Sequence, residues 1–186
     1  MKKFKYNVAI SGASDVEICT DGTKEKAFEL GQELARNKCV VISGATKGIP
    51  HKVSRGNREA GGVNVGFSPA VTRAAHTKCY KLPSEPYDII IFTGADYAGR
   101  DIVMTKAAEA MIIISGSTGT MHEFLTAFET GKIIGVLEGT GGIADEIRHF
   151  LKVARKRAKA PILYHKEPKE LVKLVVAELQ KNDKLN

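Results

Sequence analysis

Residues 115–123 read Ser-Gly-Ser-Thr-Gly-Thr-Met-His-Glu and join small, flexible residues to an acidic side chain. They follow the apolar run 110–114 and lead into an amphipathic pattern, so we expect a strand, a glycine turn and a helix start. The first N–H groups of a helix have no partner within it, and the positive end of the helix dipole lies beside them. Such a turn binds phosphate without a lysine. The predicted phosphate-binding residues are Gly116, Ser117, Thr118, Gly119 and Thr120.

Two charged side chains near this turn are candidates for catalysis. Thr120 and Glu123 have the spacing of a capping box, which by itself explains the glutamate as a helix cap. Arg100 follows a strand and a turn, and we expect it in the first turn of a helix, where a cation opposes the dipole. Residues that break a local rule are often functional, although a surface pair with Asp101 or Glu123 is the simpler alternative. We predict that Arg100 and Glu123 face one pocket, and that His122 lies at the surface or in packing.

Apolar runs alternate with helical patterns along the whole chain. The runs are apolar at nearly every position, which is typical of parallel strands covered on both faces. The alternation predicts an α/β fold, a single-domain doubly wound Rossmann-like parallel sheet of about seven strands flanked by helices, over residues 1–186. The expected strands are 8–10, 40–42, 63–67, 89–92, 111–114, 133–137 and 161–164, and the expected helices are 24–36, 52–60, 101–108, 120–130, 143–154 and 167–181.

Turns after the strands of such a sheet gather at its carboxyl edge, where ligands bind. Four of them, at 11–14, 43–48, 115–120 and 139–142, are rich in glycine, serine and threonine, which allow close approach and add hydroxyl groups. Lys47 is either a phosphate contact or an ordinary exposed lysine. The further predicted ligand-binding residues are Ser11, Gly12, Ser14, Ser43, Gly44, Ala45 and Gly48.

The segment 68–87 is the one long stretch that we expect to be irregular. Loops of that length in a compact domain are often functional. Its Thr72, Arg73 and His76 are candidates for covering a ligand, on the basis of position alone.

Composition and missing motifs exclude several classes of protein. The chain has 186 residues, 43% of them hydrophobic, which is enough for one substantial core. It lacks an apolar run near the roughly 20 residues of a membrane span, and the short run at its start does not make a secretory signal. Three scattered cysteines fit a reducing cytoplasm and argue against a metal site, so we expect a cytoplasmic protein without metal. The P-loop and dinucleotide glycine motifs are absent, which disfavours nucleoside-triphosphate hydrolysis and dinucleotide redox chemistry.

The net charge of +7 attracts anions of any kind. The densest basic cluster, residues 152–159, lies at a predicted helix end, where cations are favoured. Aromatic residues are few and none of the basic clusters is interleaved with them, as a groove for single-stranded nucleic acid would require. Nucleic-acid binding is therefore the least favoured alternative.

Taken together, these residues resemble the lonely guy (LOG) family, long mislabelled lysine decarboxylases, within a wider Rossmann-like nucleotide-binding group. The family signature PGGxGTxxE aligns with SGSTGTMHE, and Arg100 stands 23 positions before Glu123, as the family arginine does. The glycine turn 43–48 and the strand after it resemble the family's second motif, and the resemblance covers 8–147. The stretches TGADYAGRD and EGTGGIADEI resemble a subgroup of small uncharacterised proteins related to molybdenum cofactor carriers.

The resemblance implies hydrolysis of the N-glycosidic bond of a nucleoside 5′-monophosphate, a phosphoribohydrolase reaction that releases the base and ribose 5-phosphate and requires no cofactor. Amides of 116–120 would hold the phosphate. Glu123 would contact the ribose and stabilise an oxocarbenium-like transition state, and Arg100 would orient both. The resemblance also implies a homodimer through the helices that carry these two residues.

Two departures from the signature keep a second function open. Ser115 replaces the signature proline and Ser117 replaces its second glycine, where a side chain crowds the phosphate loop. Binding without turnover is then the alternative: a carrier of a nucleotide or of a phosphorylated pterin such as the molybdenum cofactor. A third alternative, nucleic-acid binding, follows from DNA-processing proteins that share this core.

Overall fold

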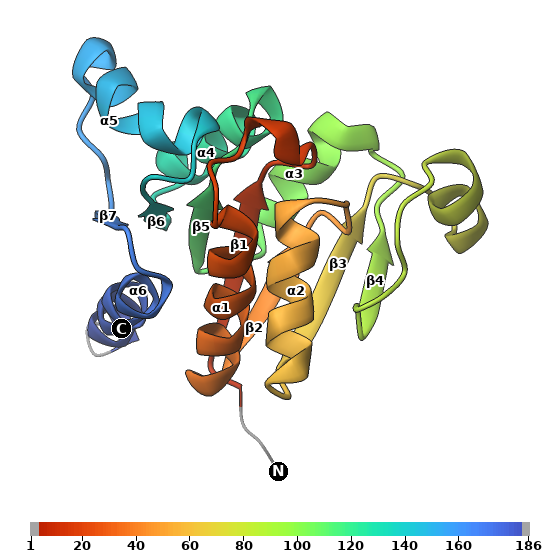
Figure 1. Cartoon of the computed structure of the whole chain (residues 1–186). Helices are drawn as coiled ribbons and strands as arrows, with labels where there is room; N and C mark the ends of the chain where they lie inside the picture. The colour runs from red at the N-terminus through yellow and green to blue at the C-terminus, as the bar shows by residue number, and fades with distance from the viewer. Residues whose placement is uncertain (1–3, 184–186) are drawn as a thin grey trace.

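A seven-stranded sheet forms the middle layer of the protein in a computed structural model that describes residues 4–183 (Figure 1). All neighbouring strands are parallel, in the order β4-β3-β2-β1-β5-β6-β7. The strands are β1 (Tyr6–Gly12), β2 (Cys39–Ser43), β3 (Val63–Ser68), β4 (Ile89–Phe92), β5 (Ala110–Ile114), β6 (Ile133–Leu137) and β7 (Ile162–His165).

The strand order reverses between β1 and β5. The chain builds the sheet outward from β1 to β4, then returns to the other side of β1 and builds outward from β5 to β7. Gly12 at the end of β1 stands beside Ile114 at the end of β5. Because connections leave these two strands in opposite directions, a crevice is expected above their carboxyl ends.

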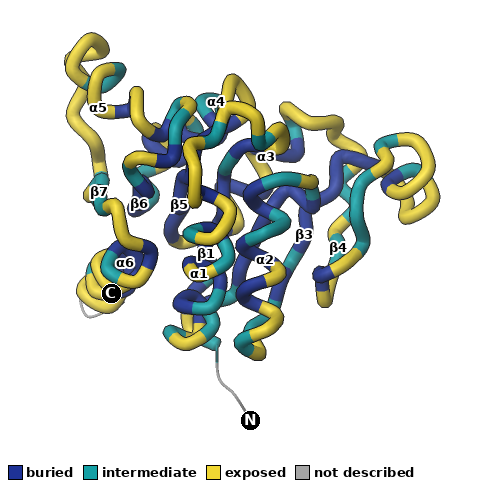
Figure 2. The backbone as a smooth tube through the Cα atoms, in the orientation of Figure 1, coloured by how far each residue is buried: buried dark blue, intermediate teal, exposed yellow. Residues whose placement is uncertain are grey.

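Helices cover both faces of the sheet. On one face, α1 (Thr23–Arg36), α2 (Ile49–Glu59) and α6 (Pro168–Asp183) close one hydrophobic cluster, and on the other α3 (Asp96–Lys106), α4 (Thr118–Glu129) and α5 (Gly142–Ala154) close a second. Every residue of β5 and β6 is buried, whereas the edge strand β4 alternates between exposed and half-buried residues (Figure 2). Continuous apolar runs therefore belong to the strands covered on both faces.

The predicted doubly wound α/β fold is confirmed within residues 4–183, including the seven strands and the six α-helices. Two helix starts were predicted three or more residues too late. α2 begins at Ile49 because Gly48 turns the chain with φ 74° and Pro50 is tolerated in a first turn. α3 begins at Asp96, so Arg100 lies in its second turn, and the argument from a cation in the first turn is wrong.

The segment 68–87 is more ordered than expected. It contains a single π-helical turn, η2 (Ala75–Cys79), and returns to the sheet at β4. His76 is fully buried: its Nδ1 lies 2.8 Å from Ser68 Oγ and its Nε2 lies 3.0 Å from Pro83 O. The histidine thus holds the two ends of the segment together and does not cover a ligand.

Within residues 4–183, none of the helices has the length and apolar character needed to cross a bilayer. The cysteines Cys19, Cys39 and Cys79 carry free thiols, and burial raises the pKa of the Cys39 thiol to about 12.

Candidate functional site

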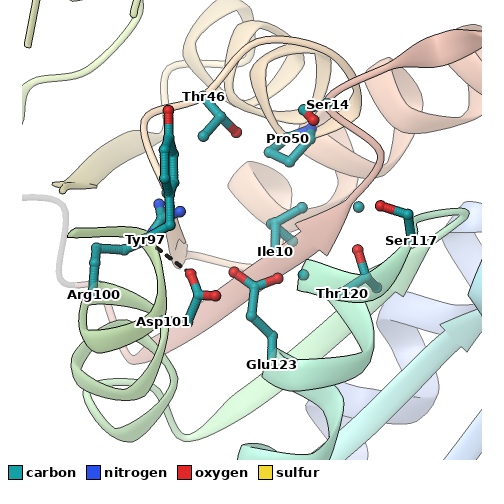
Figure 3. Close-up of a pocket in the computed structure, with 13 residues that line it drawn as sticks. Ile10, Ser14, Thr46, Pro50, Tyr97, Arg100, Asp101, Ser117, Thr120 and Glu123 are labelled. Atoms are coloured by element: carbon teal, nitrogen blue, oxygen red, sulfur yellow. Dashed lines mark ion pairs between the residues drawn. The ribbon is translucent and has the colours of Figure 1, made fainter. Parts of the chain in front are cut away.

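A pocket of about 220 Å³ opens at the carboxyl edge of the sheet, above β1 and β5 (Figure 3). It lies where the strand order reverses, as expected for this topology. Three of the four glycine-rich turns reach it. Eight of the predicted residues line it: Gly12, Ser14, Gly44, Arg100, Ser117, Gly119, Thr120 and Glu123.

The other predicted residues shape the pocket without lining it. Ser11 is buried and its hydroxyl donates to Glu123 Oε2. Ser43 donates to the Tyr87 hydroxyl at 3.1 Å, and Ala45 lies buried below the turn. Gly48 leaves no room for a side chain, since a Cβ there would lie 2.3 Å from Ala13 O. Two more residues, Gly116 and Thr118, also lie outside the lining.

Helix α4 presents its first backbone N–H groups to the pocket. It begins at Thr118 after the N-cap Ser117, whose side chain makes no capping hydrogen bond. The N–H groups of Thr118, Gly119 and Thr120 have no acceptor among the described residues, because the first helical hydrogen bond is Met121 N to Ser117 O at 3.0 Å. Apart from its chain neighbours and the nearby backbone of its own helix, no described atom lies within 4 Å of where a Cβ of Gly119 would be. The alternative in which Glu123 caps the helix is wrong, since Thr120 lies inside the helix and Glu123 in its second turn.

The turn that precedes α4 is held in an unusual shape by the neighbouring turn. Ser115 has φ 54°, a left-handed conformation that costs a non-glycine residue about 1–3 kcal/mol. Its N–H donates to Thr140 Oγ1 at 2.9 Å, and its carbonyl accepts from Ala144 N at 3.1 Å. A proline, with φ near −65°, cannot adopt this conformation. The serine at position 115 therefore suits the backbone that this chain has built.

Arg100 reaches the pocket through a gap left by a glycine. A Cβ on Gly44 would lie 1.7 Å from Arg100 Nη1, so that no other residue fits at position 44 with the arginine in place. Arg100 is 4% exposed, and its Nη1 donates to Phe67 O at 3.1 Å. Arg100 Nε lies 2.9 Å from Asp101 Oδ1, yet the two are not aligned for a hydrogen bond. No described acceptor uses Nε or Nη2.

Asp101 links the charged groups of the site, and the sequence interpretation missed it. Its carboxylate is 5% exposed and stands between Arg100 and Glu123 in Figure 3. His122 Nδ1 lies 3.2 Å from Asp101 Oδ2, so His122 is tied to the site and also remains partly exposed. The only signal for Asp101 in the sequence is its position after Arg100, where a surface pair was the alternative to a shared pocket.

Glu123 is a buried acid beside a second carboxylate. Burial, then the charge of Asp101, raises the pKa of Glu123 to about 8, although the hydrogen bond from Ser11 and the charge of Arg100 oppose the shift. The side chain is therefore largely protonated at neutral pH. A protonated carboxyl group next to a carboxylate can donate a proton to a leaving group while its neighbour stabilises positive charge.

In the described part of the chain, no three His, Cys, Asp or Glu side chains are arranged so that they could hold a metal ion. Tyr97, Thr46 and Pro50 also line the pocket and were not predicted. The tyrosine lies in the TGADYAGRD stretch, but only the fold brings it to this edge.

Comparisons with known proteins agree with this architecture. An uncharacterised protein of Archaeoglobus fulgidus is 25% identical over 131 residues, which are 70% of this chain and 79% of the relative. The solved structure of the protein TM1055 has a TM-score of 0.80 at 26% identity and covers 93% of this chain and 99% of its own.

Two further solved structures show the fold alone. The molybdenum cofactor carrier protein of Chlamydomonas reinhardtii has a TM-score of 0.76 at 21% identity and covers 95% of this chain and 99% of that one. DNA processing protein A of Helicobacter pylori has a TM-score of 0.62 at 17% identity and covers 92% and 80%. A sequence model described as the SLOG cluster4 family matches residues 5–172.

Proposed function

Since the chain belongs to the SLOG cluster4 family, we propose that it binds a phosphorylated, nucleotide-like small molecule in the pocket above β1 and β5. The phosphate lies on the N–H groups of Thr118, Gly119 and Thr120. Ser117 and Thr120 add hydroxyl donors at the same edge. A helix N-terminus with open N–H groups favours an anion through both hydrogen bonds and dipole.

The unpaired donors of Arg100 carry the proposal. A guanidinium has five N–H donors, and in the described structure a single one of them, on Nη1, has an aligned acceptor. A buried cation with unused donors is costly unless a ligand satisfies them. The pocket wall formed by α4 lies across from this side chain (Figure 3), so an anion held there meets both groups.

A direct test measures binding of inorganic phosphate and of adenosine 5′-monophosphate by calorimetry. Arg100→Ala is expected to weaken binding of both about tenfold to hundredfold, since hydrogen bonds to charged groups contribute about 1.5–3 kcal/mol. Arg148→Ala is the matched control, because it removes the same charge from an exposed position on α5. Unchanged affinity in Arg100→Ala, or an equal loss in the control, contradicts the proposal.

Turnover is the finer part of the proposal: hydrolysis of the N-glycosidic bond of a nucleoside 5′-monophosphate. The raised pKa of Glu123 supports a proton donor to the leaving base, and Asp101 supplies the negative charge for the sugar cation. Chromatography of reactions with nucleoside monophosphates measures the free base. Glu123→Gln is expected to abolish release and to retain binding. Release that is unchanged in Glu123→Gln and Arg100→Ala rules out the assignment.

A carrier of a phosphorylated pterin is the second candidate. The likeness to the molybdenum cofactor carrier protein over almost the whole chain favours it. The same N–H groups and Arg100 would hold the pterin phosphate without chemistry. Mass spectrometry of the ligand that copurifies distinguishes a pterin from a nucleotide, and nucleic acid is distinguished by a steep loss of binding with salt.

We also propose a homodimer through α3 and α4. Both helices carry exposed apolar side chains, namely Ile102 and Val103 on α3 and Leu125 on α4. Such side chains are buried at little cost when a second copy covers them. Sedimentation is expected to give a dimer at micromolar concentration, and a monomer would contradict the arrangement.

A further inference from the structure

We propose that a second compartment beside the pocket binds a planar heterocyclic ring of the same ligand. This inference rests on the proposed function, because the phosphate on α4 determines where the rest of the ligand begins. The compartment has a volume of about 330 Å³ and shares Ser14, Thr46 and Tyr97 with the first pocket. Shared walls make the two spaces parts of one elongated site.

The size of the first pocket argues that a ligand extends beyond it. At about 220 Å³ it is smaller than the roughly 300–1,000 Å³ of most small-molecule sites. The two compartments together fall well within that range. The first pocket accommodates a sugar phosphate, and a ring attached to the sugar extends past Tyr97 into the second compartment.

Two tyrosines give the second compartment an aromatic wall. Tyr97 of α3 is 48% exposed and rises above Arg100, across from Thr46 (Figure 3). Its ring meets that of Tyr80 at a centroid distance of 5.7 Å and an angle of 75°. The Tyr80 hydroxyl donates to Asp96 Oδ1 at 2.7 Å, which holds this corner in place. A planar ring stacks on such a surface with little dependence on its identity.

The segment 68–87 is built to present this wall. Leu82, which lines the compartment, donates its N–H to His76 O at 3.0 Å, and Tyr80 donates its N–H to Ala75 O at 3.0 Å. The buried His76 fastens the segment on both sides, as described above. A preorganised wall loses little entropy when a ligand binds. The long irregular segment therefore has a function at the site, through Tyr80 and Leu82 rather than Thr72 and Arg73.

The polar residues of the compartment fit the edge of a neutral ring. Lys47 and Asp15 both line it, and Lys47 has no ion-pair partner among residues 4–183. A second phosphate at Lys47 would also meet the carboxylate of Asp15. Lys47 as a hydrogen-bond donor and Asp15 as an acceptor instead suit the mixed acceptors and donors on the edge of a heterocycle. The ligand class is thus a single phosphate, a short linker and a flat nitrogen heterocycle.

Calorimetric titration with three probes tests the inference: inorganic phosphate, ribose 5-phosphate and formycin 5′-monophosphate. The last probe has a purine-like ring on a carbon–carbon bond to the sugar, so that hydrolysis of an N-glycosidic bond does not interfere. The wild-type protein is expected to bind the nucleotide at least about tenfold more tightly than ribose 5-phosphate. Tyr80 lines the second compartment and not the first pocket, so Tyr80→Ala is expected to remove most of that advantage and to leave ribose 5-phosphate binding unchanged, whereas Tyr80→Phe keeps it.

A second variant changes another residue that lines the second compartment and not the first pocket. Leu82→Trp narrows the compartment and is expected to weaken nucleotide binding without affecting ribose 5-phosphate. If the nucleotide and ribose 5-phosphate bind equally, or if Tyr80→Ala weakens both equally, the second compartment is not a ring site, and the proposed function still stands. If neither phosphate nor ribose 5-phosphate binds the wild-type protein, the proposed function fails first.

Discussion

Two glycine-rich turns that are similar in sequence differ in the structure in how the N–H groups of the following helix are hydrogen bonded. One, at 115–120, follows β5 and begins α4; the other, at 139–142, follows β6 and begins α5. In the first turn of α5, Ile143 N donates to Gly116 O at 2.9 Å and Ala144 N donates to Ser115 O at 3.1 Å. The N–H groups of that helix are therefore used by the first turn, while those of α4 stay open.

The N–H groups of the second turn are also bonded by a carboxylate of the protein itself. Asp145 accepts from Gly139 N at 2.7 Å and from Gly141 N at 2.9 Å, so a carboxylate of the chain occupies the place of a ligand. The difference shows that a glycine turn binds ligand only where the fold leaves its donors unpaired. The N–H groups of Thr118, Gly119 and Thr120 meet that condition because they border the reversal of strand order, and among the described residues the turn before α5 bonds to Ser115 and Gly116 rather than to them.

A substitution that disrupts the turn before α5 is expected to have the largest effect, and this effect is on the stability of the protein. Gly141 has φ 79°, and a Cβ there would lie 2.6 Å from Ile18 O. Gly141→Ala is expected to lower the free energy of unfolding by about 2 kcal/mol or more, through strain and overlap. Urea denaturation measures this loss. A variant as stable as the wild type would show that this turn does not support its neighbour.

The buried acid of α4 is expected to make the stability of the protein depend on pH. The pKa of Glu123 is about 8 in the folded protein and near 4.5 when exposed, so its contribution to stability is complete below pH 4.5 and is lost as the pH rises to 8. Glu123→Gln is expected to remove this fall. Relative to the wild type, the variant gains at least about 1.4 kcal/mol between these pH values, which corresponds to one pKa unit.

Denaturation curves at several pH values measure that difference. Glu129→Gln serves as the control, since it removes an exposed carboxylate from the end of the same helix. A difference between wild type and Glu123→Gln that stays constant with pH would rule out the buried acid.

Filling the open turn is expected to have the smallest effect on stability and a clear one on binding. Gly119 lies in α4 with free space around its Cβ position, so Gly119→Ala is expected to raise stability by about 0.5–1 kcal/mol. The same methyl group stands before the free N–H groups and is expected to weaken phosphate binding severalfold. Thermal unfolding measures the expected gain in stability, and calorimetry measures the expected loss of phosphate affinity. Stronger or unchanged phosphate binding would place the anion elsewhere.

Local patterns predicted the elements better than their ends. The run 110–114 is apolar at each position and is a fully buried strand, because burial on both faces leaves a direct trace in composition. The start of α3 was missed because Gly94 and Gly99 surround Asp96 and Tyr97 with residues typical of a loop. Thr120 and Glu123 match a capping box by spacing, yet Ser11 of β1 takes the glutamate in the folded chain. The local capping rule failed for Glu123 because its hydrogen-bond partner lies more than a hundred residues away in the chain.

The sequence by itself determined the α/β fold class, the order of its elements and the rim on which Arg100, Glu123 and the glycine turns gather, because these depend on periodicity and on parallel topology. Only the tertiary structure decided which donors stay free, which carboxylate stands beside Glu123, and that Tyr80 joins Tyr97 at a second compartment. These properties depend on contacts between residues far apart in the chain, and no local pattern records such contacts.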